Sequence, residues 1–251
     1  MTARVLVVAE PGDAQLVAAP GTFAWGHLEV ASTDSGGRTA DRFDLVTAFG
    51  AAGLPSANAS VRWLEHAGAG PRRIEERTIA PAGDGLWSRR LWPVSDELFE
   101  LAPPPAPLAL LVGRPSPLLE QLLERAADRR IAFEVVERLT VGAIARSSCV
   151  VLLEAPGSDA LPARAAAVLA ARRVLLTPRA KVCFGLQPQL DHLQLDEPNQ
   201  ALNFVESVLT RPDAFVRLVH WGGLAAQRHR ASGIFGKLLA EVRPDRDAGG
   251  R

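Results

Sequence analysis

The chain has 251 residues, of which 47% are hydrophobic and 22% are charged, so it has enough apolar side chains for a substantial core and is not a disordered chain. Its 28 basic and 28 acidic residues balance, which leaves no net field to attract nucleic acid or an anionic membrane. No apolar run approaches the roughly 18 residues of a membrane span, and Cys149 and Cys183 form neither a disulfide framework nor a zinc motif.

The amino-terminal segment predicts a first strand. Its apolar stretch, Val5–Ala9, is followed at once by an acidic residue and a proline, and it is too short for a secretory signal. We therefore expect a cytoplasmic protein. Lys181 and Lys237 are the only lysines, and this preference for arginine indicates the coding bias of a GC-rich, bacterial genome.

The first hundred residues predict a reduced α/β domain. Short strand-like stretches are joined by segments with weak helix patterns, and they lie at residues 5–8, 27–31, 43–48 and 61–64. A proline-rich segment at 101–107 follows, and it predicts a stiff, extended linker because proline removes backbone donors and favours polyproline geometry.

After the linker, strands alternate with helices. Buried strands are predicted at 108–112, 132–136, 149–153 and 174–177, and helices at 118–126, 141–146 and 161–171. Such alternation implies parallel strands with right-handed helical crossovers. Three amphipathic helices then close the chain, and residues 244–251 form a polar tail that we expect to be disordered.

These patterns predict an α/β protein with two Rossmann-like domains, of which the first is reduced. The expected division is an N-terminal domain at 1–100, a linker at 101–107, a C-terminal domain at 108–243 and a tail at 244–251.

Several common catalytic signatures are absent from the sequence. There is no Gly-x-Gly-x-x-Gly or P-loop for phosphates, and no Gly-x-Ser-x-Gly elbow for a serine nucleophile. The histidines lack the spacing of a metal site. Asp245 and Asp247 have the form of an Asp-x-Asp metal motif, but they lie in the polar tail, where a solvated charge run is the favoured interpretation.

The most informative local segment is Leu110–Pro117. A strand ends in Gly113, Arg114 follows, and Ser116 with Pro117 supplies an N-cap and a first-turn proline for a helix. This order places a cation and helical N–H groups at the carboxyl edge of a parallel sheet, where phosphates bind in many α/β proteins. The alternative is that Gly113 only turns the chain and Arg114 is solvated.

The second half of the chain resembles the donor-binding half of GT-B glycosyltransferases, especially the CgeB-like group. Residues 112–117 (VGRPSP) resemble the turn of that family written "VGR.sP", and residues 161–177 resemble its "p.RvfEalAcGa.lLt" segment. Residues 193–211 and 228–239 resemble its closing strand and helices. The resemblance implies a GT-B fold and metal-independent transfer of a sugar from a nucleoside diphosphate sugar.

The resemblance also implies which residues would hold the donor, and where the site has changed. Ala167 stands where the family has an acidic residue for the donor, Arg172 stands where it has a glycine, and Leu118 and Leu119 stand where a cation for the diphosphate is usual. Arg179 and Lys181 could replace the missing charge. The implied donor-binding set is Gly113, Arg114, Ser116, Arg164, Arg179 and Lys181.

Two functions from different classes follow, and a third interpretation is a nucleotide-binding α/β regulator that uses only the Gly113 turn. The first is a glycosyltransferase-like enzyme with a nucleotide-sugar donor, an unknown acceptor and no cofactor or metal. The second is an inactive pseudo-glycosyltransferase that binds a protein partner, with Trp87, Trp92 and Trp221 as candidate surface residues. No catalytic residue can be aligned, and Glu10, Asp13 and His66 are candidates by position only. The sugar, the stereochemical course and the oligomeric state stay open.

Overall fold

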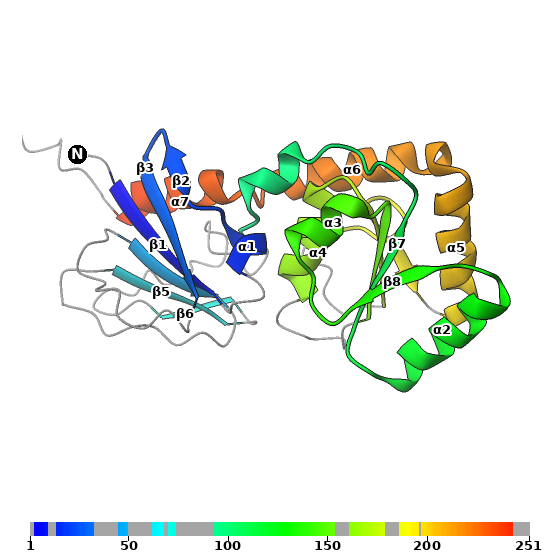
Figure 1. Ribbon diagram of the computed structural model, residues 1–251. Coiled ribbons are helices and arrows are strands. Elements are labelled where there is room, and N and C mark those ends of the chain that lie inside the picture. Colours follow the sequence, from blue (N-terminus) through cyan, green and yellow to red (C-terminus); the bar gives the residue numbers. More distant parts are fainter. Residues whose placement is uncertain are drawn as a thin grey trace, which may run out of the picture. The chain divides into compact units, whose positions relative to one another are not determined.

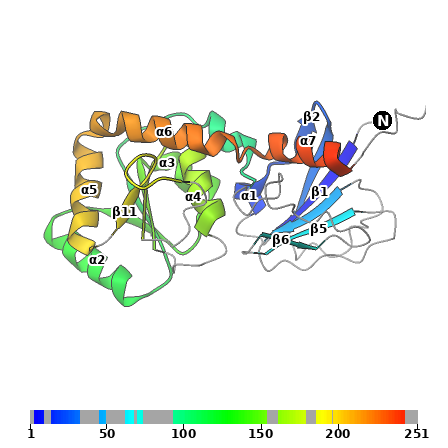
Figure 2. The ribbon, with the colours of Figure 1, turned by 180° about the vertical axis from the view of Figure 1, so that it is seen from behind.

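The computed structural model shows two compact α/β units. The first comprises the chain up to Asp96 together with the segment from His229 onward, and the second runs from Glu97 to Arg228. Each unit has its own sheet (Figures 1 and 2), so the predicted α/β class with two Rossmann-like units is confirmed. The structure describes residues 3–9, 14–32, 45–49, 62–67, 70–73, 93–153, 161–178, 186–195 and 197–242.

The first unit contains a sheet in the order β2-β3-β1-β4-β5-β6. Strands β3, β1, β4 and β5 are parallel, and the outer strands β2 and β6 are antiparallel to their neighbours. The four predicted strands are β1, β3, β4 and β5, which are therefore confirmed, whereas β2 and β6 were not predicted. The elements are β1 (Ala3–Ala9), α1 (Ala14–Val17), β2 (Gly21–Phe23), β3 (Gly26–Ser32), β4 (Leu45–Phe49), β5 (Arg62–Ala67) and β6 (Gly70–Arg73).

The last helix, α7 (Ala231–Val242), belongs to the first unit. Its Phe235 is fully buried in a cluster that includes Val5 and Val7 of β1. The indole N–H of Trp25 donates to the main-chain oxygen of Ser232, 2.9 Å away. This differs from the expected domain division, which placed the chain through residue 243 in the second domain. The periodicity of α7 shows that it buries one face but not which sheet that face covers.

The segment that leaves the first unit lies beside the segment that returns to it. The N–H of Val94 donates to His229 O at 2.7 Å, and the N–H of Ala231 donates to Val94 O at 2.9 Å. The Asp96 carboxylate accepts from the N–H and the hydroxyl of Ser232, at 3.0 and 2.6 Å. These bonds tie the start of α7 to residues 94–96.

The proline-rich segment at 101–107 lies inside the second unit. The guanidinium of the buried Arg173 donates to Ala102 O at 2.6 Å and to Ile144 O at 3.1 Å. The chain therefore changes units between Asp96 and Glu97, before the segment that the sequence suggested as the linker. Arg173, which lies 71 residues after Ala102, thus holds the proline-rich segment in place.

The second unit contains a fully parallel sheet in the order β11-β10-β9-β7-β8. The strands and helices predicted between residues 108 and 177 are all present, and of the three predicted closing helices α5 and α6 lie in this unit and α7 in the first. The elements are η2 (Asp96–Glu100), β7 (Ala109–Val112), α2 (Pro117–Asp128), β8 (Phe133–Val136), α3 (Val141–Arg146), β9 (Cys149–Leu152), α4 (Leu161–Ala170), β10 (Val174–Pro178), β11 (Leu193–Leu195), α5 (Pro198–Thr210), η3 (Pro212–Phe215) and α6 (Val216–Gln227).

Helices cover both faces of this sheet (Figure 1). Alternate strand residues such as Leu111, Val151 and Leu176 form one apolar cluster with Leu122 of α2 and Val205 of α5. The intervening residues face the other side, because successive side chains of a strand alternate, and α4 packs on β9 and β10 there. Complete burial of β7 and β9 agrees with their continuous apolar sequences.

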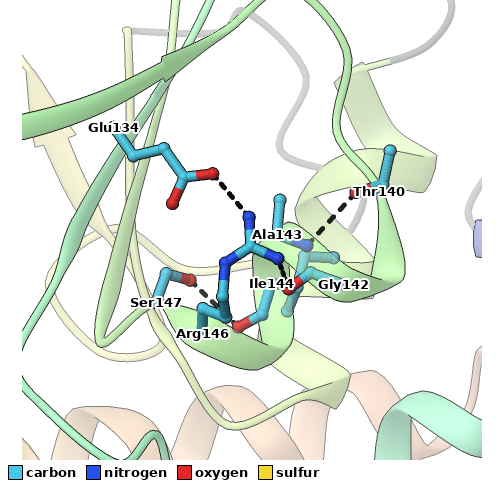
Figure 3. Close-up of polar contacts among 7 residues, drawn as sticks. All are labelled: Glu134, Thr140, Gly142, Ala143, Ile144, Arg146 and Ser147. Carbon is cyan, nitrogen blue, oxygen red and sulfur yellow. Dashed lines mark hydrogen bonds and ion pairs between the residues drawn. The ribbon is translucent and has the colours of Figure 1, made fainter.

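Polar side chains fix the short helix α3 at both ends (Figure 3). The hydroxyl of Thr140 accepts from the N–H of Ala143 at 3.2 Å, and the hydroxyl of Ser147 donates to Ile144 O at 3.0 Å. Arg146 forms an ion pair of 2.6 Å with Glu134 on β8. The bonds of Thr140 and Ser147 satisfy backbone groups that a helix of this length cannot pair internally.

Two helices end with arginine in the left-handed conformation. Arg130 after α2 has φ 58°, and Arg172 after α4 has φ 56°. At Arg172 the N–H donates to Leu169 O, and the N–H of Arg173 donates to Val168 O, at 3.0 and 3.2 Å. This is the paired hydrogen-bond pattern of a Schellman motif, in which glycine is usual at the left-handed position. Arg172 therefore adopts a backbone conformation that glycine usually supplies.

Among the described residues, no helix has both the length and the apolar character needed to cross a membrane.

Candidate functional site

The carboxyl edge of the second sheet contains a topological switch point. From β7 the chain passes to β8 on one side, and β9 lies on the other side of β7. Loops therefore leave the carboxyl ends of β7 and β9 in opposite directions, and open α/β sheets bind ligands at such a crevice. The predicted donor-binding residues Gly113, Arg114 and Ser116 all follow β7 at this edge.

Gly113 is buried where the ends of three strands meet. Its N–H donates to Val136 O of β8 at 3.1 Å. A Cβ added to Gly113 would lie 3.1 Å from the Cβ of Leu153, just after β9. A larger residue would therefore displace the chain at the switch point, which gives Gly113 a packing role whether or not a ligand binds.

Ser116 is the N-cap of α2, as predicted. Its hydroxyl accepts from the N–H of Leu119 at 3.2 Å, and its main-chain oxygen accepts from the N–H of Glu120 at 3.0 Å. Because Pro117 has no N–H, the N–H of Leu118 is the donor that this helix end retains for a ligand. The helix dipole still places partial positive charge at this point.

Arg114 is exposed, and within the described part of the chain it makes no hydrogen bond or ion pair. A guanidinium in this state is available to a phosphate or a carboxylate. The two leucines that follow Pro117 differ from each other in exposure. Leu118 is 40% exposed, whereas Leu119 is 6% exposed and packs in the core beneath α2. A cation could therefore be accommodated at residue 118 but not at 119.

Thr177 is a candidate residue that sequence reasoning missed. It lies near the carboxyl end of β10, and its buried hydroxyl has no hydrogen-bond partner among the residues that the structure describes. Since Leu176 belongs to the cluster beneath α2 and α5, Thr177 faces the side that α4 covers. Buried polar groups are normally paired, so this hydroxyl is a candidate to bind a ligand or a water molecule.

Arg164 lies half-buried near the start of α4, which follows β9 and therefore begins at the same edge. Ala167, one turn later, is fully buried. A carboxylate there would be enclosed by apolar neighbours and would need a partner to offset its desolvation. The structure thus brings Gly113, Arg114, Ser116 and Arg164 to one edge of the sheet, and Arg179 and Lys181 lie outside the described residues.

Comparison with known proteins gives little further definition. No protein-family model matches the chain, and no curated protein matches it. Among solved structures, the chain is similar to a sucrose-phosphate synthase from Thermosynechococcus elongatus, with 13% sequence identity and a TM-score of 0.38. The match covers 81% of this chain and 59% of that protein, so the chain spans less than two thirds of its length.

The remaining sequence candidates are placed only in part. His66 is within β5, and Trp221 is 45% exposed on α6. Within the described ranges, no group of three or more histidine, cysteine or acidic side chains is arranged to hold a metal ion. Glu10, Asp13, Trp87, Trp92, Asp245 and Asp247 lie outside the described residues, as does Cys183.

Proposed function

We propose that the carboxyl edge of the second sheet binds a nucleoside diphosphate sugar and that the protein is a glycosyltransferase of the GT-B type, close to the CgeB-like group. The observation that supports this most directly is Arg114, exposed and without a partner among the described residues, directly after Gly113 at the switch point. Arg164 and the buried hydroxyl of Thr177 lie at the same edge of the sheet.

In the proposed reaction an acceptor hydroxyl attacks the anomeric carbon of the donor sugar. The bond between that carbon and the diphosphate oxygen breaks, and the electron pair leaves with the nucleoside diphosphate. Negative charge therefore develops on the leaving diphosphate. Arg114 and the N-terminal end of α2 would stabilise this charge without a metal ion, while Arg164 would orient the donor. The general base and the acceptor are unassigned.

Calorimetric titration with UDP-, GDP- and dTDP-sugars tests this proposal. Micromolar binding to the natural chain, weakened at least tenfold in Arg114→Ala, is the expected result, since a charge-assisted hydrogen bond contributes about 1.5–3 kcal/mol. Arg125→Ala, at the opposite end of α2, is the matched control and should bind as the natural chain does. Absence of heat at millimolar ligand would refute donor binding.

A second function is favoured by the substitutions at the same edge. Ala167 is fully buried and Leu118 is an exposed apolar side chain, in positions where the resembling family has an acid and a cation. These features support an inactive pseudo-glycosyltransferase that binds a protein partner. If no nucleotide sugar binds while the fold is intact, this second function is the one to pursue. A cytoplasmic location remains a prediction for either function.

A further inference from the structure

A hollow of about 310 Å³ lies between α6 and the turn that precedes β11. Because this turn leads into the amino end of β11, the hollow lies at the opposite edge of the sheet from Gly113, and it is separate from the proposed donor site. Its walls are formed by Gln187, Leu190, Asp191, Trp221, Leu224, Ala225 and Arg228.

Apolar side chains are exposed around this hollow. Leu190, Trp221 and Leu224 are 42%, 45% and 49% exposed, and all three line it. They come from two elements that are 30 residues apart in the chain, so the clustering is a property of the fold. Exposed apolar side chains gathered around a concavity mark an interaction surface.

The walls of the hollow are held rigidly. The Asp191 carboxylate accepts from the N–H of Gln187, at 2.9 and 2.8 Å, and from Nδ1 of the buried His192 at 2.8 Å. Helix α6 approaches this turn closely, because a Cβ on Gly222 would lie only 2.9 Å from Asp191 O. The hollow is therefore formed before any partner arrives, which lowers the entropic cost of binding.

The charge of the exposed face of α6 indicates what kind of partner would bind at the hollow. The helix contains no acidic residue. Arg217 and His220 are exposed beside Leu224 and Trp221, and His220 meets the indole of Trp221 edge-on at 5.8 Å. Arg228 follows at the end of the same face and lines the hollow. Among the described residues that line the hollow, Asp191 has the one carboxylate, and it is occupied within its own turn.

From this arrangement we infer that the hollow is a docking site for a segment of another protein that inserts one apolar side chain and places acidic residues beside it. A hollow of this size accommodates a leucine or phenylalanine side chain with its flanking backbone. Tryptophan and arginine are the residue types that contribute most to binding at protein interfaces. Acidic flanks would complement Arg217, which is exposed on the same face of α6.

Two other occupants fit the surface less well. A second copy of the chain, related by a two-fold axis perpendicular to α6, would bring together two helix faces that contain no acidic residue, so Arg217 would meet no carboxylate of the facing helix. An anionic membrane would favour a convex apolar face, whereas the apolar side chains here surround a concavity. Both alternatives are outcomes of the test below.

The test is a selection of random 12-residue peptides displayed on phage against the full-length protein. The expected result is a set of peptides that share a large apolar residue flanked by aspartate or glutamate. Their affinity should fall at least tenfold in Trp221→Ala and in Arg217→Glu, both of which should melt at the temperature of the natural chain. Val135→Ala, an exposed apolar residue on the opposite edge strand β8, is the control and should bind normally.

Three results would overturn the inference. They are the absence of any peptide whose binding depends on Trp221, a consensus without acidic residues, and concentration-dependent dimerisation that Trp221→Ala abolishes. Cosedimentation with phosphatidylglycerol vesicles but not with phosphatidylcholine vesicles, lost in Trp221→Ala, would assign the surface to a membrane instead. These outcomes are independent of nucleotide-sugar binding, since Arg114→Ala should leave peptide affinity unchanged.

Discussion

The guanidinium of Arg173 donates a 2.6 Å hydrogen bond to the main-chain oxygen of Ala102. The same buried side chain also donates to the oxygens of Ile144 and Ala145 at the end of α3, where the helix dipole favours a cation. Burial lowers the pKa of Arg173, and these three carbonyl groups offset the cost of enclosing its charge. One residue thus connects β10, α3 and the proline-rich segment.

We predict that Arg173→Met lowers the free energy of unfolding of the second unit by about 2–4 kcal/mol, because the buried carbonyl oxygens lose their donor. Chemical denaturation monitored by circular dichroism measures the change. Arg172→Met, at the exposed neighbouring residue, should change stability by less than about 0.5 kcal/mol. Equal effects of the two substitutions would contradict a structural role specific to Arg173.

Glycine at the left-handed helix ends should stabilise the protein. Arg130→Gly and Arg172→Gly each remove the strain of a side chain at positive φ, and we expect a gain of about 0.5–1 kcal/mol for each. Thermal melting of the single variants checks this. Arg130→Ala retains the Cβ and should give no gain, so stabilisation by alanine as well would show that the charge, not the backbone, is responsible.

Two helical glycines should respond in opposite directions to alanine. A Cβ on Gly222 would lie 2.8 Å from Leu169 Cδ2 and 2.9 Å from Asp191 O, so Gly222→Ala should cost about 1–3 kcal/mol through overpacking. In the same unit, a Cβ on Gly142 would meet only the flexible Arg146 side chain at 3.6 Å. Gly142→Ala should be neutral or stabilising by up to about 1 kcal/mol. Urea denaturation of both variants compares them directly.

The Cys149 thiol should be unreactive in the folded protein. Burial raises its pKa from 9.0 to about 12, so the nucleophilic thiolate is scarce at pH 8. In a Cys183→Ser background, a disulfide reagent should label no thiol in the native state and one thiol in denaturant. Rapid native labelling would contradict the burial.

The same shift predicts a pH dependence of stability. A raised folded-state pKa stabilises the native state fully below the unfolded value, and this contribution is lost as pH rises from about 9 to about 12. Cys149→Ala should therefore lose less stability than the natural chain across this interval, as measured by denaturation at successive pH values.

Introducing a cation at the start of α2 should have different effects at Leu118 and at Leu119. Leu118→Arg adds charge at a 40% exposed position and should strengthen inorganic pyrophosphate binding about tenfold at unchanged stability. Leu119→Arg places the charge in the core and should destabilise the unit by more than about 2 kcal/mol. Calorimetry with pyrophosphate and thermal melting measure the two effects. If Leu118→Arg does not bind pyrophosphate more tightly than the natural chain, phosphate binding at this end of α2 is excluded.

The second unit could be predicted from the sequence because its signals are local. Ser116 and Pro117 mark the start of α2, and the apolar runs of β7 and β9 match strands that are buried on both faces. The placement of α7 could not be predicted, since its apolar face would fit either sheet. The role of the proline-rich segment depends on Arg173, which lies 71 residues beyond Ala102.

The features of the candidate site that depend on the order of residues along the chain could be predicted from the sequence. The features that depend on burial in the folded protein could not. The Gly113 turn, Arg114 and the Ser116 cap all follow from one strand-to-helix junction. Thr177 lies near the end of an apolar strand, and nothing in the sequence shows that its hydroxyl lacks a partner within the described part of the chain. The hollow beside Trp221 likewise depends on the approach of α6 to residues 187–191, which are distant in sequence.

The interrupted first unit has a consequence for protein synthesis. Phe235 of α7 covers the same apolar cluster as Val5 and Val7, so the amino-terminal sheet is translated more than 130 residues before the helix that completes its core. The second unit is continuous from Glu97 to Arg228, so all of it emerges from the ribosome before α7 does. During synthesis the second unit can therefore be completed first, while the apolar cluster of the amino-terminal sheet still lacks the part that α7 covers, and this is the period in which chaperones would be needed most.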